Sequence, residues 1–170
     1  MTQSVELMLD TAAEEAVLAQ WRLLADAGLP SQAHHTGASN RPHVTLTASP
    51  LLAEAAEGPV ARVCAERLPR RARWGSLAVF GADPVVLVRL LVVTPPLLEL
   101  HAAVARLVEV PEESLVAPGR WTPHVTLARR MPLDRLADAL RVLGPGRGDP
   151  VRLTGARRWD SERRRDWTVV

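Results

Sequence analysis

The sequence Pro-His-Val-Thr-Leu occurs twice, at residues 42–46 and at residues 123–127. Side chains of an extended strand alternate between two faces, so His and Thr of each copy point one way while Val and Leu point the other. Each copy therefore predicts a strand with one polar and one apolar face. Because each half of the 170-residue chain carries one copy, the repeat suggests an internal duplication.

The elements expected around the two copies also repeat, in the order strand, helix, His-Thr strand, helix, strand. In the first half we expect a strand at 5–9, a helix at 11–28 with Thr11 as its N-cap, the first motif strand, a helix at 51–68 and a strand at 74–80. In the second half we expect elements at 85–93, 96–110, 121–128, 133–143 and 151–159, with a last strand at 166–170. Helices mixed with hairpins of this kind predict an α+β fold.

Composition narrows the class of protein. All 21 basic residues are Arg, which indicates a compositional bias and is compatible with a phosphate-bearing ligand. The single cysteine, Cys64, excludes an intrachain disulfide and fits a reducing cytosol. No secretion signal begins the chain, and the longest apolar run, 85–93, is interrupted by Arg89 and is too short to span a membrane. We therefore expect a soluble, cytoplasmic protein that makes no membrane contact.

The polar faces of the two strands suit chemistry at phosphorus. If His43 and His124 lie on opposite sides of a phosphate, one can act as base on the attacking oxygen and the other as acid on the leaving oxygen. Histidine fits both tasks because its ordinary pKa is about 6.5. Hydroxyl groups of Thr45 and Thr126 would hold the remaining phosphate oxygens. This scheme needs no cofactor or metal. The plainer alternative is that two amphipathic strands share a sequence, with His and Thr on a solvated face.

Twin His-x-Thr motifs, the second within Trp-Thr-Pro-His-Val-Thr-Leu-Ala-Arg, resemble those of the two-histidine (2H) phosphoesterase superfamily. The resemblance extends over nearly the whole chain and is to the bacterial branch of 2′-5′ RNA ligase and RNA 2′,3′-cyclic phosphodiesterase proteins. It implies one domain, residues 1–170, with pseudo-twofold lobes of about 1–84 and 85–170. It further implies two antiparallel sheets lining a central cleft, helices outside, and no metal.

The same resemblance implies the site. The catalytic pair falls on His43 and His124, the phosphate-binding hydroxyls on Thr45 and Thr126, and a phosphate-binding arginine on Arg129. Strict alternation would turn Arg129 away from the histidines, so we expect the strand to end or bulge there, or the side chain to bend round. One departure concerns the substrate: the RNA ligase branch commonly continues its first motif with Arg and Phe, whereas Thr47 and Ala48 stand here.

Several other residues are candidates for contact with a substrate. His34 and His35 precede the first motif, and Asn40 and Trp121 lie close to the motif strands. His101, within an expected helix, is interpreted as a surface residue. A C-terminal cluster could grip an RNA backbone or could form a solvated hairpin; it comprises Arg157, Arg158, Arg163, Arg164 and Arg165, flanked by Trp159 and Trp167.

Three functions follow from these observations and the resemblance. The first is a metal-independent phosphodiesterase that hydrolyses 2′,3′-cyclic phosphates of RNA ends or nucleotides, with 2′-5′ RNA ligation as the reverse type of reaction. The second is cleavage of a small metabolite such as an ADP-ribose cyclic phosphate. The third is an RNA-binding module without chemistry. For each we expect a monomer.

Overall fold

A computed structural model describes residues 2–145 and 148–170. Within these residues the chain forms seven strands and four α-helices, together with three short 3₁₀ helices. The order is β1 (Gln3–Leu9), α1 (Thr11–Asp26), β2 (His43–Ser49), α2 (Glu57–Arg67), β3 (Arg70–Phe80), β4 (Val85–Val92), α3 (Pro95–Leu107), β5 (His124–Met131), α4 (Leu136–Leu143), β6 (Pro150–Asp160) and β7 (Arg165–Thr168). The α+β class is therefore as predicted.

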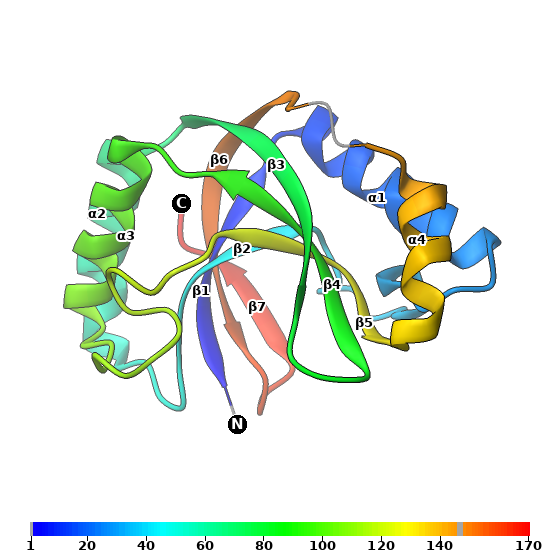
Figure 1. Cartoon of the computed structure of the whole chain (residues 1–170). Coiled ribbons are helices and arrows are strands. Elements are labelled where there is room, and N and C mark those ends of the chain that lie inside the picture. Colours follow the sequence, from blue (N-terminus) through cyan, green and yellow to red (C-terminus); the bar gives the residue numbers. More distant parts are fainter. Residues whose placement is uncertain (1, 146–147) are drawn as a thin grey trace.

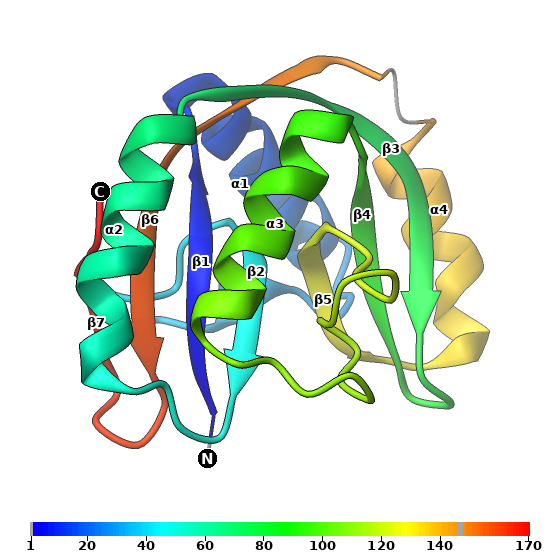
Figure 2. The same ribbon diagram turned by 90° about the vertical axis from the view of Figure 1, so that its left-hand side faces the viewer.

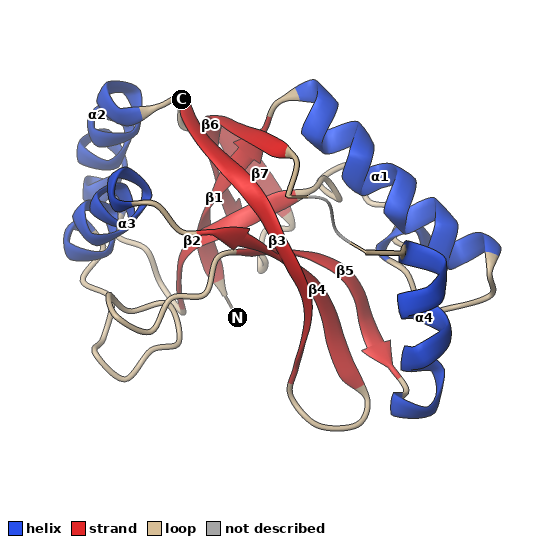
Figure 3. Ribbon diagram, turned by 45° about the horizontal axis from the view of Figure 1, so that its top comes forward, coloured by secondary structure: helices blue, strands red, loops and turns tan. Residues whose placement is uncertain are grey.

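The strands form one continuous antiparallel sheet, ordered β2-β1-β6-β3-β4-β5, with β7 on the other edge of β6 at its far end (Figure 3). Two separate sheets were expected. The strands are joined because β3 is long enough to pair with two partners: Arg70–Arg73 pair with β6, and residues from Arg73 onward pair with β4. Read from either end, the sheet begins with a His-Thr strand, then the first strand of the same half, then the strand that follows the second helix of the other half.

The helices cover the sheet in two pairs. Helices α2 and α3 pack together on one side of the strands, and α1 and α4 pack together on the other (Figures 1 and 2). Apolar side chains from the strands and from both helix pairs form the core, including Leu7, Val44, Leu97 and Val125, all of which are fully buried. No helix within residues 2–145 and 148–170 is long and apolar enough to cross a bilayer.

Contacts in the structure explain two differences between the observed and the predicted helix starts. Helix α1 is capped by Asp10 rather than Thr11, because the Asp10 carboxylate accepts a hydrogen bond from the Ala13 amide at 2.9 Å. Helix α2 begins at Glu57, six residues later than expected. The backbone of Leu52 is held outside a helix by two side chains: Gln3 accepts from its amide, and Arg158 donates to its carbonyl.

Candidate active site

The two His-Thr strands, β2 and β5, lie beside each other although they stand at opposite ends of the hydrogen-bonded sheet. Two tryptophans tie them in place. The Trp121 indole donates to the Thr45 carbonyl at 2.9 Å, and the Trp21 indole donates to the Thr126 carbonyl at 3.0 Å. Each motif strand is thus held by an aromatic side chain from another element. The fold brings the two motifs to one place.

A β-bulge in each strand changes which side chains share the His-Thr face. In β2 the register shifts at Leu46, since Thr45 pairs with Glu6 and Thr47 with Val5. In β5 it shifts at Leu127, in the same position of the motif. The residues that follow the two bulge positions, Thr47 and Ala128, are both fully buried. The alternation is therefore reset in both copies by one extra residue.

The bulge confirms one of the alternatives expected for Arg129. The strand continues to Met131, but the extra residue at Leu127 returns Arg129 to the side of His124 and Thr126. Arg129 is exposed and lines the same cavity as His43 and Thr45. The corresponding residue of the first copy, Ala48, also lines this cavity. Of these two equivalent positions, only that of the second motif carries a guanidinium group.

The imidazole rings are oriented in the same way in both motifs. Nδ1 of His43 lies 2.8 Å from the Arg41 carbonyl, and Nδ1 of His124 lies 2.7 Å from the Thr122 carbonyl. A carbonyl oxygen only accepts, so the proton of each neutral ring is assigned to Nδ1. Nε2 of each ring is then the nitrogen that can take up a proton.

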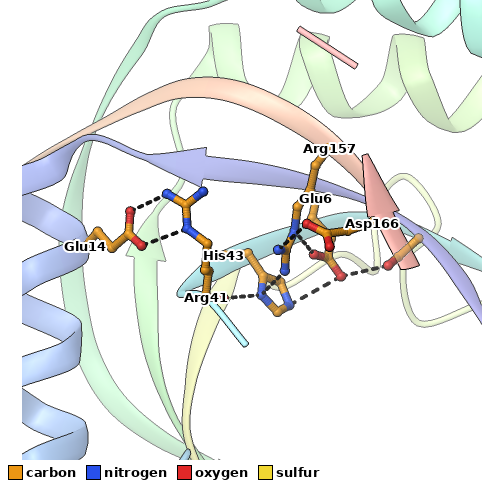
Figure 4. Close-up of polar contacts among 7 residues, drawn as sticks. Glu6, Glu14, Arg41, His43, Arg157 and Asp166 are labelled. Atoms are coloured by element: carbon orange, nitrogen blue, oxygen red, sulfur yellow. Dashed lines mark hydrogen bonds and ion pairs between the residues drawn. The ribbon is translucent and has the colours of Figure 1, made fainter. Parts of the chain in front are cut away.

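The surroundings of His43 are charged. Its Nε2 lies 3.5 Å from a carboxylate oxygen of Glu6 (Figure 4). The Glu6 side chain is buried, and its carboxylate also accepts hydrogen bonds from Arg157 at 2.7 Å and from Ser4 at 2.8 Å. Arg157 in turn donates to Asp166 at 3.0 Å. The Arg157 guanidinium also lies 3.5 Å from Nδ1 of His43, but this nitrogen already donates to Arg41, so we interpret that contact as packing.

The surroundings of His124 are apolar. Phe80 packs edge-on against its ring with centroids 4.8 Å apart, and Val88 occupies the position that Glu6 occupies beside the first motif. Burial lowers the pKa of His124 from its ordinary value, and the charges of His43 and Arg129 lower it further, against the hydrogen bond to Thr122. The two rings stand at equivalent positions of the neighbouring strands β2 and β5.

A cavity of about 1060 Å³ opens beside the first motif. Its lining includes His43, Thr45, Arg129, His35 and Asn40 among the candidate residues from the sequence. His124 and Thr126 are half-buried and are not among the lining residues. Asn40 also has a structural role, because its side-chain amide donates to the carbonyls of Gln32 and His35 and so holds the loop that forms one wall.

His101 differs from its sequence-based interpretation, and Trp121 packs against it. Trp121 is only 9% exposed, its N–H is bonded to Thr45, and its ring stacks on His101 at 4.2 Å. It is not among the residues that line the cavity, and its hydrogen bond positions β2. His101 is buried rather than at the surface, with Nε2 2.9 Å from the Val116 carbonyl. Burial lowers its pKa, so this ring is a neutral donor in the core.

Other reactive side chains lie outside the site. Burial raises the pKa of the Cys64 thiol to about 11, so this group is not a thiolate near neutral pH. In the part of the chain that the structure describes, no group of three or more His, Cys, Asp or Glu side chains is placed to hold a metal ion.

The sequence matches a family model for the 2′-5′ RNA ligase superfamily over residues 9–163. The chain belongs to this superfamily. The predicted resemblance of the chain to 2H phosphoesterases is thereby confirmed. No curated protein matches the chain.

Several solved structures have a fold similar to that of this chain. The crystal structure of TT0787 of Thermus thermophilus is 21% identical, with a TM-score of 0.62, and the match covers 94% of this chain and 88% of that one. Escherichia coli LigT complexed with 3′-AMP is 13% identical, with a TM-score of 0.58 and coverage of 97% and 90%. LigT complexed with NADP+ is 15% identical, with a TM-score of 0.58 and coverage of 97% and 91%.

The sequence analysis did not identify Glu6 as a candidate site residue. It placed Arg157 in the C-terminal arginine cluster. A signal for Glu6 was present, because it is the one charged residue in the strand Gln-Ser-Val-Glu-Leu-Met-Leu. A lone acid on an otherwise apolar strand requires a partner when it is buried. The partner could not be inferred, because Arg157 is 151 residues away in the chain.

Proposed function

We propose that this protein is a metal-independent phosphodiesterase that hydrolyses 2′,3′-cyclic phosphates of RNA ends or nucleotides. The observation that carries the proposal is the matched orientation of His43 and His124. Each donates through Nδ1 to the carbonyl two residues earlier, which makes Nε2 the proton-transfer atom of both rings. Two equivalent proton-transfer groups on adjacent strands suit in-line displacement at phosphorus.

The different surroundings of the two rings suggest their roles. The lowered pKa of His124 keeps this ring neutral near pH 7, so it is suited to take a proton from the attacking water. His43 has Glu6 as an ion-pair partner when it carries a proton, so it is suited to protonate the leaving ribose oxygen. Water adds to phosphorus, the bond to O3′ breaks, and a 2′-phosphate remains. Ligation of a 2′,3′-cyclic end would use the two groups in the same roles, with a 5′-hydroxyl in place of water as the attacking group, and cleavage of the 2′-5′ linkage would exchange the roles.

The phosphate oxygens need donors during this step. The hydroxyls of Thr45 and Thr126 and the guanidinium of Arg129 are the candidates, from positions on the two motif strands. Arg129 forms no ion pair within residues 2–145 and 148–170, although it is exposed, and a free guanidinium group is suited to bind a phosphate.

The test is turnover of 2′,3′-cyclic nucleotides and of cyclic-ended oligonucleotides by the wild type, His43→Ala and His124→Ala. Each variant should lose about 10² to 10⁴ in kcat, because each loses one positioned proton transfer. Addition of a chelator should leave wild-type turnover unchanged. Urea unfolding of each variant checks that the fold is retained.

Normal turnover by either variant would contradict the pairing, and loss of wild-type activity with a chelator would contradict the metal-independent scheme. Tight binding of RNA by a wild type that turns over none of these substrates would favour the binding module instead. Faster turnover of an ADP-ribose cyclic phosphate than of any oligonucleotide would favour the small-metabolite alternative.

A further inference from the structure

The C-terminal arginines separate into two groups in the structure. Arg157 and Arg158 are buried and neutralised, Arg157 by Glu6 and Asp166 and Arg158 by Glu57 at 3.1 Å. Arg163 is exposed and lies 3.9 Å from Asp160. These three have partners within the protein, so they are not free to bind an external anion.

Arg164 and Arg165 form the second group. Both are exposed, both line the cavity that contains His43 and Thr45, and neither side chain makes an ion pair or hydrogen bond with another described residue. The carboxylates in the same lining, Glu6 and Asp166, are already paired with Arg157. The uncompensated charge at this end of the cavity is therefore positive.

This positive end is distant from the reacting position. Strand β7 lies three strand spacings from β2, which is about 14 Å. Thr168 is the residue of β7 that lies level with Thr45. Arg165 precedes Thr168 by three residues, which adds about 10 Å along the strand. The two backbone positions are thus about 17 Å apart. A phosphate held by His43 and Thr45 is too distant to be the anion that Arg165 contacts.

An aromatic surface lies between these two ends. Trp159 is half-buried and lines the same cavity, and it is two residues from Arg157 on β6, so both side chains point to one face of the sheet. It pairs across the strands with Ser4 and Asp166, which also line the cavity. Cationic groups on either side of an aromatic ring are the pattern by which proteins hold a nucleotide chain.

The backbone at Arg164 supports a ligand-binding role. Its φ is 50°, in the left-handed region that side chains other than glycine rarely adopt. Arg130, directly after Arg129, has a φ of 56°. Uncommon backbone conformations of this type are concentrated at ligand sites. Here one lies at Arg164 itself and the other directly follows Arg129, so they adjoin the unpaired arginines of the cavity.

We propose that the turn carrying Arg164 and Arg165 is a second phosphate subsite, with Trp159 as a platform for the base between the two phosphates. The preferred substrate is then a nucleotide 2′,3′-cyclic phosphate that carries a second phosphate. This inference rests on the proposed function. The second phosphate can come from the next phosphodiester of an RNA or from the 5′-phosphate of a small nucleotide.

The test compares three substrates: adenosine 2′,3′-cyclic phosphate, the same compound with a 5′-phosphate, and a dinucleotide with a 2′,3′-cyclic end. The variant is Arg164→Asn with Arg165→Gln, since Asn tolerates the left-handed backbone. The matched control is Arg163→Gln, in the same turn but outside the cavity lining.

The double variant should lower kcat/KM for a two-phosphate substrate by at least about tenfold, mainly through KM, because charge-assisted hydrogen bonds are lost. The one-phosphate substrate and the control variant should be unaffected. A loss on the 5′-phosphate compound identifies a small nucleotide, and a loss confined to the dinucleotide identifies RNA. Equal losses on one- and two-phosphate substrates, or no loss on any, would overturn the proposal.

Binding measurements separate this proposal from the proposed function. If the wild type hydrolyses none of the three compounds, calorimetry with adenosine 2′,5′-bisphosphate and adenosine 2′-phosphate still tests the subsite. Binding of the bisphosphate at least about tenfold more tightly than the monophosphate, with this advantage lost in the double variant, would support the second subsite while the catalytic proposal fails. Equal affinities in the wild type would refute the subsite.

Discussion

At the scale of single residues, two identical pentapeptides hold histidines in different surroundings. His43 contacts the buried Glu6 and Arg157 pair, whereas His124 contacts the ring of Phe80. Glu6 pairs with Thr45 of the first motif, and Val88 pairs with Thr126 of the second. The equivalent position therefore holds a carboxylate beside His43 and an apolar side chain beside His124. The strand neighbours, and not the motif, therefore distinguish the two rings.

The lowered pKa of His124 can be measured. Its ring protons should titrate in NMR with a midpoint below about 6.5, because burial disfavours the charged form. If His124 is the base, kcat/KM falls only when the pH drops through this lowered value, so activity extends to more acid pH. Phe80→Ala should expose the ring, raise its pKa and move the acid limb to higher pH.

Val79→Ala is the matched control, because Val79 neighbours Phe80 on β3 but is 42% exposed. It should leave the His124 titration unchanged. A wild-type midpoint above the ordinary histidine value, or a fall of the pKa in Phe80→Ala, would show that burial is not the dominant cause.

At the scale of elements, hydrogen bonds from tryptophans fix the motif strands beside each other. The Trp121 indole holds the carbonyl of Thr45, and its ring is supported by stacking on His101 in α3. The Trp21 indole, from α1, does the same for Thr126. Each half-site is thus held by a donor outside its own strand.

Trp121→Phe should keep the stacking on His101 but leave the Thr45 carbonyl without its donor. We expect a loss of about 1 to 3 kcal/mol in the free energy of unfolding, the usual cost of an unsatisfied buried polar group. We also expect a lower kcat, because His43 and Thr45 are on the loosened strand. Urea unfolding and steady-state kinetics measure the two effects.

Trp167→Phe provides the comparison, because its indole donates to Glu57 at 2.9 Å, away from both motif strands. This variant should retain the wild-type kcat. An unchanged kcat in Trp121→Phe, together with reduced stability, would mean that this hydrogen bond stabilises the fold without positioning the site.

At the scale of the whole molecule, two histidines with lowered pKa values link stability to pH. Burial lowers the pKa of both His101 and His124 in the folded state. Below about pH 6.5 the unfolded chain takes up protons at these positions that the folded chain does not. Above about pH 7, protonation of these two histidines should therefore not change the free energy of unfolding. The free energy of unfolding should fall as the pH is lowered through about 6 to 5.

Urea unfolding at about pH 7, 6 and 5 measures this loss. His101→Gln should be less stable at neutral pH, because it loses the stacking on Trp121, and its stability should depend less steeply on pH. His34→Gln, at an exposed loop position, is the control for removal of one imidazole. Equal slopes in the wild type and His101→Gln would contradict the linkage.

The elements themselves could be predicted because they depend on local patterns. Alternation in the two pentapeptides and the helix-start signal near Thr11 each predict an element that the structure contains. Errors occurred where distant side chains act on a local segment. The start of α2 is set by Gln3 and Arg158 holding Leu52, and His101 is buried because Trp121 stacks on it.

The sequence alone determined the two His-Thr strands and the α+β class, since periodicity and short-range sterics encode both, whereas the bulge or bend expected at Arg129 also needed the family resemblance. Only the tertiary structure decided that one sheet contains all strands, that Glu6 and Arg157 meet beside His43, and that Arg164 and Arg165 remain unpaired among the described residues at the cavity. These depend on contacts between residues far apart in the chain. Such contacts form only when the packed core fixes which distant side chains meet.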